Sequence, residues 1–425
     1  MTELHTITVA GVAKAYLCCS CGACGFVCPE NAILFKETPG GYCFPVINGE
    51  LCTECGKCLR SCPGVILSAD LPDDPFAGET LGCWVGKASE DAVYTGSQSG
   101  GGVTGILLTL MADGKIDGAA TVTMDAGTPP RPVVRIARTR EEILAAQGSK
   151  YCPVPVLASL KDLTVESGPI ALVGLACHVH GLHNLFQEFP ELRAKVSPVI
   201  GLLCDRVMTT AAIDYLLWKT DMEWEDPVTF EFKSKRWRGY PGDIRVSREG
   251  GDEIFLPAEE RMKIKDYFTP ARCRLCFDKM NVLADITAGD PWGLPEVDRK
   301  RGETTLIART PAGLEAVLMA IDNGQIILRE VSYDRILDGQ QINKKRAEFA
   351  GYCAAWSSMR RPVPAQAETV LRTVSVHKRN RKFVRNLRRA LRLDQFKSRR
   401  ALVHHIRNRL RRREIVKKIK RAFTY

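Results

Sequence analysis

Two short segments of the chain are rich in cysteine and share the same cysteine spacing. Residues 18–29 read CCSCGACGFVCP and residues 52–63 read CTECGKCLRSCP, so both contain the pattern C-x2-C-x2-C-x3-C-P. The 425 residues include 17 cysteines, too many to explain as small core residues. The chain opens without the basic and apolar segments of a secretion signal, so we expect a cytoplasmic protein with reduced thiols rather than a disulfide framework. The spacing therefore indicates metal ligation.

This pattern is typical of bacterial ferredoxins, in which the fourth cysteine binds the neighbouring cluster. Glycines between the cysteines let backbone N–H groups approach the sulfurs, and the closing proline turns the fourth cysteine away. Zinc sites use two separated pairs instead. We predict two 4Fe–4S clusters, one on Cys18, Cys21, Cys24 and Cys62 and the other on Cys52, Cys55, Cys58 and Cys28. Cys19 and Cys43 fall outside the pattern and are expected to be small buried residues.

Net charge is distributed unevenly along the chain. From Leu371 onward, 21 lysines and arginines stand against Asp394 and Glu414, a net charge of +19. The whole chain carries +11, so residues 1–370 carry −8. No apolar run reaches the roughly 18 residues needed to span a bilayer, which predicts a soluble or peripheral protein.

The order of apolar runs and turns predicts a mixed α+β and α/β architecture in three parts. Residues 1–70 form a ferredoxin-like domain with two clusters, residues 81–365 a central mixed α/β domain, and residues 366–425 basic C-terminal helices. In the central domain, strands are expected at 82–88, 117–124, 169–176 and 197–204, a helix at 103–114, and a meander at 228–235, 242–248 and 252–260.

Two further motifs are ambiguous when considered alone. Gly100, Gly101 and Gly102 precede the expected helix, and such a turn either offers N–H groups to a phosphate or is simply flexible. Cys273 and Cys276 form a C-x2-C pair, which Cys177 and Cys204 complete as a set of four, unless the pair is half a zinc site and the others are core thiols.

Together, these motifs resemble the family of coenzyme F420 hydrogenase/dehydrogenase beta subunits. The resemblance covers roughly residues 15–350 and rests on the cysteine repeats, SGGGVTGILLTLM, GSKYCPVPV, GLAC, GLLC and RCRLCFDKMNVLADITAGDPWG, in this order. Ala176 stands where the family usually has the proline of Gly-Leu-Pro-Cys. Family membership implies an iron–sulfur flavoprotein whose α/β domain holds FAD.

The resemblance also implies site residues. Contacts to the FAD phosphates fall on Ser99, Gly100, Gly101, Gly102, Val103 and Thr104, and contacts along the cofactor fall on Ser149, Lys150 and Tyr151. Lys150 would place a positive charge near the flavin, unless it is a solvated lysine. A third 4Fe–4S cluster would use Cys177, Cys204, Cys273 and Cys276. Asp290 would orient substrate or flavin, or else cap a turn.

The function implied is electron transfer between 4Fe–4S clusters and FAD. Our preferred hypothesis has reduced ferredoxin, or another redox partner, supply electrons that finally reduce an unidentified organic substrate. The reverse route would take hydride from reduced coenzyme F420 or NAD(P)H, and a non-catalytic electron-transfer subunit is the other alternative. His178, His180 and His183 could donate protons, although a polar helix face explains them equally well.

The C-terminal segment repeats apolar residues at helical spacing, at Leu402, Ile406, Leu410, Ile415, Ile419 and Phe423. A basic amphipathic helix of this kind can lie on an anionic membrane surface, at the inner face of the membrane. Nucleic acid is not the expected ligand, because aromatic residues for base stacking are sparse. A helix folded against the acidic body is the alternative.

Overall fold

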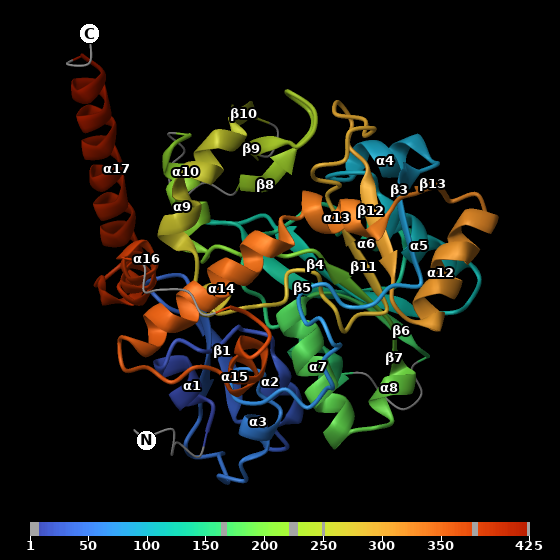
Figure 1. The fold of residues 1–425 in the computed structure, drawn as a ribbon, viewed down its shortest axis with the longest axis horizontal. Helices are drawn as coiled ribbons and strands as arrows, with labels where there is room; N and C mark the ends of the chain where they lie inside the picture. The colour runs from blue at the N-terminus through green and yellow to red at the C-terminus, as the bar shows by residue number, and fades with distance from the viewer. Residues whose placement is uncertain (1–7, 163–167, 221–227, 249–250, 376–380, 423–425) are drawn as a thin grey trace.

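The computed structural model describes residues 8–162, 168–220, 228–248, 251–375 and 381–422. A central eight-stranded sheet has the order β13-β3-β12-β11-β7-β6-β4-β5 (Figure 1). Its strands are β3 (Gly82–Ala88), β4 (Gly118–Asp125), β5 (Arg131–Ala137), β6 (Ile170–Leu175), β7 (Val196–Leu202), β11 (Ile286–Gly289), β12 (Thr304–Ala308) and β13 (Ile326–Glu330). The pairs β4–β6, β6–β7 and β7–β11 are parallel, and the other pairs are antiparallel.

Helices cover both faces of this sheet because its strands are apolar on both sides. Ile200 faces a core that includes α5 (Gly102–Ala112) and α12 (Pro311–Asp322). The preceding residue, Val199, faces the other core, with α7 (Ala176–Glu188) and the 3-10 helix Val156–Asp162. Short helices α4 (Asp91–Gly96), α6 (Arg140–Ala145) and α8 (Leu192–Lys195) connect these elements. The expected mixed α/β architecture is confirmed at this level.

The cysteine-rich N-terminal part consists of short elements around an antiparallel hairpin. They are α1 (Ala10–Lys14), α2 (Ala23–Val27), β1 (Ile33–Glu37), β2 (Cys43–Ile47) and α3 (Lys57–Arg60). Both cysteine loops run into a helix whose preceding residue is a left-handed glycine: Gly22 (φ 96°) before α2 and Gly56 (φ 71°) before α3. A side chain at Gly22 would also lie 2.6 Å from backbone atoms of Pro155 and Ala158, so glycine is required there for packing as well.

The expected meander exists as a separate three-stranded sheet, β8 (Val228–Ser234), β9 (Asp243–Arg248) and β10 (Glu253–Leu256). It was predicted to continue to residue 260, but β10 ends at Leu256 and α10 (Ala258–Phe268) follows Pro257. Proline fixes a backbone angle compatible with a helix start and cannot donate to a strand ladder. Helices α9 (Ala211–Trp218) and α11 (Ala271–Arg274) flank α10 in the chain.

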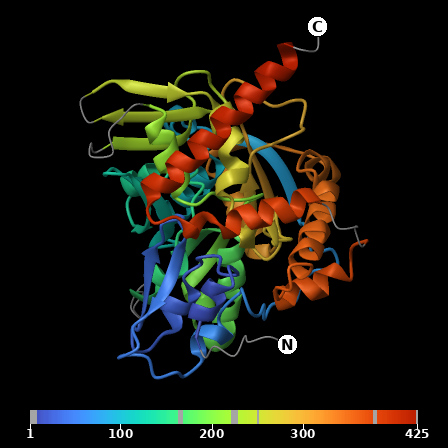
Figure 2. The same ribbon diagram turned by 90° about the vertical axis from the view of Figure 1, so that its left-hand side faces the viewer.

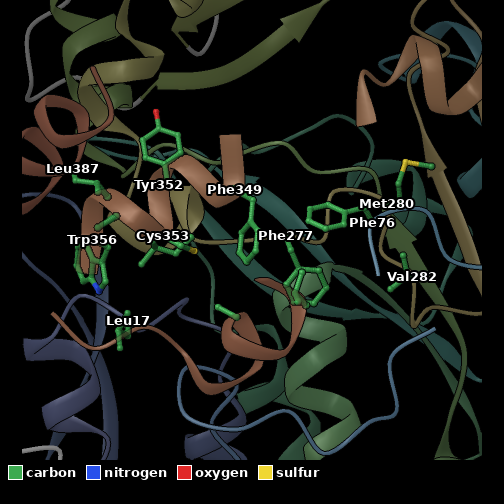
Figure 3. Close-up of a cluster of buried hydrophobic side chains, with 14 of the residues drawn as sticks. Leu17, Phe76, Phe277, Met280, Val282, Phe349, Tyr352, Cys353, Trp356 and Leu387 are labelled. Atoms are coloured by element: carbon green, nitrogen blue, oxygen red, sulfur yellow. The ribbon is translucent and has the colours of Figure 1, made fainter. Parts of the chain in front are cut away.

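The C-terminal helices begin with α13 (Tyr333–Gly339) and α14 (Ile342–Ser357), and continue with α15 (Ala365–Leu371), α16 (Arg381–Leu391), a short 3-10 turn (Leu393–Gln395) and α17 (Arg399–Ala422). Figure 3 shows Trp356 of α14 in one buried cluster with Leu17, Phe76, Phe277 and Leu387. These residues come from the cysteine-rich part, the linker, the loop after Cys276 and α16. One core therefore joins segments that the sequence assigned to three parts.

Half of the expected amphipathic stripe of α17 is buried in the body rather than free. Leu402 and Ile406 are 1% and 3% exposed and pack in the core that contains α9. Figure 2 shows the base of α17 lying against the body of the protein. Arg399 anchors the base of α17 through ion pairs with Asp214 and with Glu37. The alternative of a helix folded against the acidic body therefore holds for this half, whereas Ile415 is 48% exposed. The side chain of Ile419 and all of Phe423 lie outside the described residues. In the part of the chain that the structure describes, no helix combines the length and the hydropathy required to cross a bilayer.

Candidate functional site

The eight N-terminal cysteines form the two groups that their spacing predicts. The thiols of Cys18, Cys21, Cys24 and Cys62 are electrostatic neighbours, and burial raises the pKa of Cys62 to about 12. Backbone N–H groups approach the ligand sulfurs, from Ser20 to Cys18 Sγ at 3.3 Å and from Ala32 to Cys28 Sγ at 3.3 Å. Such hydrogen bonds to sulfur are one means by which proteins set cluster potentials.

The second group lies at the surface of the protein. Cys28, Cys52, Cys55 and Cys58 line one small hollow, and Cys55 is exposed. Burial raises the pKa of Cys58, and the thiols of Cys52, Cys55 and Cys28 add to that effect. This group is therefore the one that a partner protein could approach most closely.

The third group assembles cysteines that lie far apart in the sequence. Cys177 is the second residue of α7, Cys204 follows β7, and Cys273 and Cys276 lie in and after α11. Negative charge on Cys204 or Cys273 raises the pKa of the Cys177 thiol, and negative charge on Cys273 or Cys276 raises the pKa of the Cys204 thiol. These thiols are therefore close to one another. Burial raises the pKa of Cys273 to about 11. All four predicted ligands thus lie together in the structure.

Two buried cations flank the third group. Arg272, 7% exposed, donates to the carbonyl oxygens of Leu275 (3.2 Å) and Pro63 (3.4 Å). Burial by itself lowers its pKa, but nearby thiols, Cys276 foremost, hold the pKa above its ordinary value. Lys345 of α14 is 6% exposed, and its positive charge favours lower pKa values for the thiols of Cys204, Cys273 and Cys276. These cations lower the cost of negative charge on the buried sulfurs.

Cys19, expected to be a small buried residue outside the motif, lies between the first and third groups. Its sulfur is within hydrogen-bonding reach of both Cys21 and Cys177. Cys43 remains apart from the three groups, and burial raises its pKa to about 12. The sequence did not indicate that the first and third groups adjoin, because that contact joins residues more than 150 positions apart.

The donor sets fit iron–sulfur clusters better than single ions. Among the described residues, no three side chains of His, Cys, Asp or Glu converge closely enough to hold one metal ion. A 4Fe–4S cubane keeps its four thiolates apart, because each binds a different iron. Each of the three groups supplies four cysteines, the number and kind of ligand that such a cluster requires.

A large cavity opens at the carboxyl ends of the parallel strands. Its volume is about 990 Å³, and its wall includes Leu175 of β6, Leu202 of β7 and Gly289 of β11. Ligands of open α/β sheets bind in this position, beyond the strand ends. The same cavity reaches Cys204, so it adjoins the third cysteine group.

All but one of the predicted flavin and catalytic residues line this cavity. They are Ser99, Gly101, Gly102, Val103, Thr104, Ser149, Lys150, Tyr151 and Asp290. Gly100 is buried behind the wall instead: its N–H donates to Thr304 Oγ1 at 3.0 Å, and a side chain there would lie 2.3 Å from Gly86 O. Gly102 N–H donates to the same oxygen at 3.2 Å. Thr304 therefore holds the glycine turn at the start of α5, where the first N–H groups lack intrahelical partners.

Lys150 lines the cavity, but its ammonium is turned to the backbone. Its Nζ donates to the carbonyl oxygens of Ala146 (2.6 Å), Gln147 (2.8 Å) and Gly148 (2.9 Å), just after α6. Burial lowers its pKa to about 7. The side chain is half-buried, and its ammonium holds a chain turn rather than extending freely into solvent.

Asp290, directly after β11, pairs with a lysine that the sequence did not single out. Lys233 Nζ lies 2.8 Å from Asp290 Oδ2, and the two side chains are 5% and 10% exposed. The Lys233 ammonium also lies over the rings of Tyr151 (5.5 Å) and Trp292 (5.8 Å). Burial alone lowers the pKa of Lys233, but Tyr151 and Asp290 raise it above its ordinary value.

The sequence pattern does not indicate that Lys233 faces the cavity, and the reason is geometric. Alternation along β8 assigns it to the face opposite Phe232, the solvated face of a meander strand. The register between β8 and β9 shifts after Glu231, and such an irregularity redirects side chains. No short pattern in the sequence marks that shift.

The ring nitrogens of the three histidines of α7 make hydrogen bonds within the protein, and His178 also lies in the wall of the cavity. His178 accepts from Leu175 N–H through Nδ1 (3.1 Å) and contacts Val154 O through Nε2 (3.1 Å), so both ring nitrogens are used. His180 pairs with Asp278 at 2.9 Å, and His183 contacts Leu283 O at 3.0 Å. The alternative of a polar helix face is wrong for His178 and His180, which are 5% and 2% exposed because α7 packs this side against its neighbours.

Comparison with known proteins identifies the family. For the beta subunit of coenzyme F420 hydrogenase/dehydrogenase, the model of the N-terminal region matches residues 83–161, and the model of the C-terminal region matches residues 168–333. One subunit of the F(420)H(2) dehydrogenase of Methanosarcina mazei is 30% identical over 341 residues, 75% of this chain and 86% of that protein. The chain belongs to the family of coenzyme F420 hydrogenase/dehydrogenase beta subunits, and it is a redox protein of that type.

Two further relatives come from Methanosarcina barkeri. Its coenzyme F420 hydrogenase subunit beta is 26% identical over 298 residues, 65% of this chain and 96% of that protein. A chain in a solved structure of its F420-reducing NiFe hydrogenase complex is 22% identical, with a TM-score of 0.49, and covers 66% of this chain and 96% of that chain.

Proposed function

We propose that this protein is an iron–sulfur flavoprotein oxidoreductase that passes electrons between 4Fe–4S clusters and FAD. The observation that carries the proposal is the continuity of the sites: a surface thiol group, an inner thiol group and a third group follow one another, and the third adjoins the large cavity. The thiol of Cys24 is close enough to Cys58 of the surface group for charge on Cys58 to raise its pKa. The sulfur of Cys19 is within hydrogen-bonding reach of Cys21 in the first group and of Cys177 in the third group. Bound flavin exchanges single electrons with clusters and electron pairs with organic molecules.

The ligand assignment follows from this grouping. Two clusters belong to the ferredoxin-type motifs with exchanged fourth ligands, and a third belongs to Cys177, Cys204, Cys273 and Cys276. The exposed Cys55 makes the surface group the entry point for ferredoxin or another protein donor. Lys345 and Arg272 lie beside the third group, where positive charge favours the reduced, more negative cluster. This arrangement supports electron flow inward, toward the cavity.

The cavity residues divide into a phosphate end and a reaction end. The start of α5, with Val103 and Thr104 in its first turn, would hold the phosphates of FAD, and Thr304 would keep that turn in shape. Ser149, Lys150 and Tyr151 would lie along the cofactor. Lys233 and Asp290 would orient an organic substrate, because their charges face the cavity and little water reaches them. The wall as a whole favours anions, since its basic residues Lys150, Lys233, Lys265, Lys279, Lys344, Lys345, Arg206 and Arg261 outnumber Asp205, Asp290, Asp338 and Glu348.

A second function is favoured by the names of the relatives, which are called subunits. In that case, the chain would exchange electrons with a partner enzyme, or would oxidise reduced coenzyme F420 or NAD(P)H for it. Turnover by the isolated chain with an artificial donor supports the first function. Recovery of activity only within a hetero-complex supports the second.

Anaerobic purification tests the cofactor proposal directly. We expect a brown protein with about 12 irons and matching sulfide per chain, and FAD in the acid-released fraction. A colourless preparation that contains only zinc would refute it. The single variants C276S and C62S should each remove about four irons, whereas C43A should remove none.

A further inference from the structure

A wide groove lies between α16 and α17, outside the redox sites. Its volume is about 900 Å³, and its floor includes Tyr267 of α10 and the apolar side chains Leu393, Leu402 and Ile406. Its rim is basic, formed by Arg381, Arg385, Arg388, Arg389, Arg392, Arg409 and His405. Within the described part of the chain, the residues that line the groove include no aspartate or glutamate.

Three arginines of the rim have no acidic partner among the described residues. Among the described residues, the guanidinium groups of Arg385, Arg388 and Arg392 make no salt bridge, although each is exposed. Other tail arginines behave differently, since Arg399 pairs with Asp214. A concentration of like charges without counter-charges destabilises a protein unless an anion neutralises it.

Two buried polar atoms of the groove also lack partners among the residues that the structure describes. Tyr267 is 2% exposed, yet its hydroxyl makes no hydrogen bond to them, and neither does Arg389 Nε. Arg389 stacks over the Tyr267 ring at 4.3 Å and donates to Asp266 O at 3.3 Å. Burial lowers the pKa of Arg389, and Arg409 and Arg413 add repulsion. Buried polar atoms in native proteins are normally satisfied, so a bound acceptor is expected here.

The chemistry of the groove selects phosphate attached to an apolar body. Arginine forks match the oxygens of phosphate better than any other side chain. The floor of Leu393, Leu402 and Ile406 adds apolar surface beside the charges, which inorganic phosphate would leave unused. A phospholipid supplies both parts.

The position of the groove favours a lipid in a bilayer. Beyond the groove, α17 extends away from the body (Figure 1). Its residues Ile415 and Val416, which follow Glu414, are 48% and 51% exposed. A free apolar stretch of this kind can enter the headgroup region of a membrane. Figure 1 places α3, which contains Cys58, at the lower edge of the molecule, away from α17. Attachment through α17 therefore leaves this edge open to a soluble donor.

We propose that the groove between α16 and α17 is a binding site for the phosphate headgroup of an anionic phospholipid, which anchors the protein to a membrane surface. This site goes beyond the redox function and does not depend on it. It differs from attraction of the whole basic tail, because it assigns recognition to particular arginines.

Vesicle co-sedimentation with the full holoprotein separates the two. We compare the triple variant R385Q/R388Q/R392Q, which changes three groove arginines, with K397Q/R411Q/R412Q, which removes the same charge from exposed positions outside the groove wall. With phosphatidylglycerol vesicles, the groove variant should lose at least ten times more affinity than the control variant. Y267F should also weaken binding without altering charge. Circular dichroism spectra and thermal unfolding midpoints equal to those of the wild type show that each variant is folded.

Several results would overturn the proposal. One is an equal loss of vesicle affinity in both triple variants. Another is equal binding of the wild type to vesicles whose negative charge comes from a sulfated sterol without phosphate. A third is the absence of binding between the wild type and phosphatidylglycerol vesicles. Binding to an acidic protein or to an oligonucleotide, with none to vesicles, would overturn it too. Protection of the wild type, and not of the groove variant, by a short-chain soluble phosphatidylglycerol would support it.

Discussion

Replacement of Thr304 by valine tests how the glycine turn at the cavity is held. Thr304 is 4% exposed, and its hydroxyl oxygen accepts hydrogen bonds from Gly100 N–H (3.0 Å) and Gly102 N–H (3.2 Å). Valine has nearly the same shape, so the substitution creates little cavity. It leaves two buried backbone donors without an acceptor.

The magnitude follows from the cost of those orphaned donors. Each buried polar group that loses its partner costs about 1–3 kcal/mol, so T304V should destabilise the folded turn by roughly 2–6 kcal/mol. At the lower end this is a factor of roughly 30 in an equilibrium constant. FAD affinity should fall with it, because the turn must be ordered before it can hold phosphates.

The neighbouring threonine supplies a matched control. Thr305 is 1% exposed on the same strand, β12, and its hydroxyl makes no hydrogen bond to any residue that the structure describes. T305V removes an unpaired buried hydroxyl from the same strand and changes the same atoms. It should therefore leave stability unchanged or raise it.

The assay is urea unfolding followed by two signals, circular dichroism for the chain and flavin fluorescence for cofactor release. T304V should unfold and release flavin at lower urea than the wild type, and T305V should not. Equal midpoints for the two variants would refute the reasoning that Thr304 holds the turn. Loss of flavin without loss of chain stability would confine the role of Thr304 to the cofactor site.

Three further outcomes follow from the structure. K233M should destabilise the protein by about 3–5 kcal/mol in thermal unfolding, because it leaves Asp290 buried without its cation. The double variant K233M/D290N should recover most of that loss. A K233M variant as stable as the wild type would contradict the pairing. Burial lowers the pKa of Lys150 from 10.5 to about 7 in the folded chain. Between these two pH values the unfolded chain holds more protons than the folded chain. The free energy of unfolding therefore rises with pH, by up to about 1.4 kcal/mol per pH unit. K150M should lack that rise when urea unfolding is compared at two alkaline pH values, and a parallel rise in the variant would show that another group is responsible. C177S should remove the third cluster alone, seen as loss of one of three signals in a redox titration followed by electron paramagnetic resonance, whereas loss of the first cluster instead would reassign Cys177.

The family and the main elements could be predicted from the sequence. The family is confirmed by the comparisons, and the strand at 82–88 is observed as β3, Gly82–Ala88. Other boundaries moved by a residue or more where a turn intervenes, as at Pro257. The iron–sulfur and flavin assignments stay predictions, although the structure brings the proposed ligands together.

What the sequence by itself determined was local. Cysteines two or three residues apart are held near one another by the chain itself, and the glycines before α2, α3 and α5 mark turns at the same short range. The tertiary structure alone decided which distant residues meet. Thr304 reaches the glycine turn, Lys233 reaches Asp290, and Cys19 reaches Cys177, because strand order, a register shift and helix packing place them there. Those contacts depend on how whole elements stack, and no short segment carries that information.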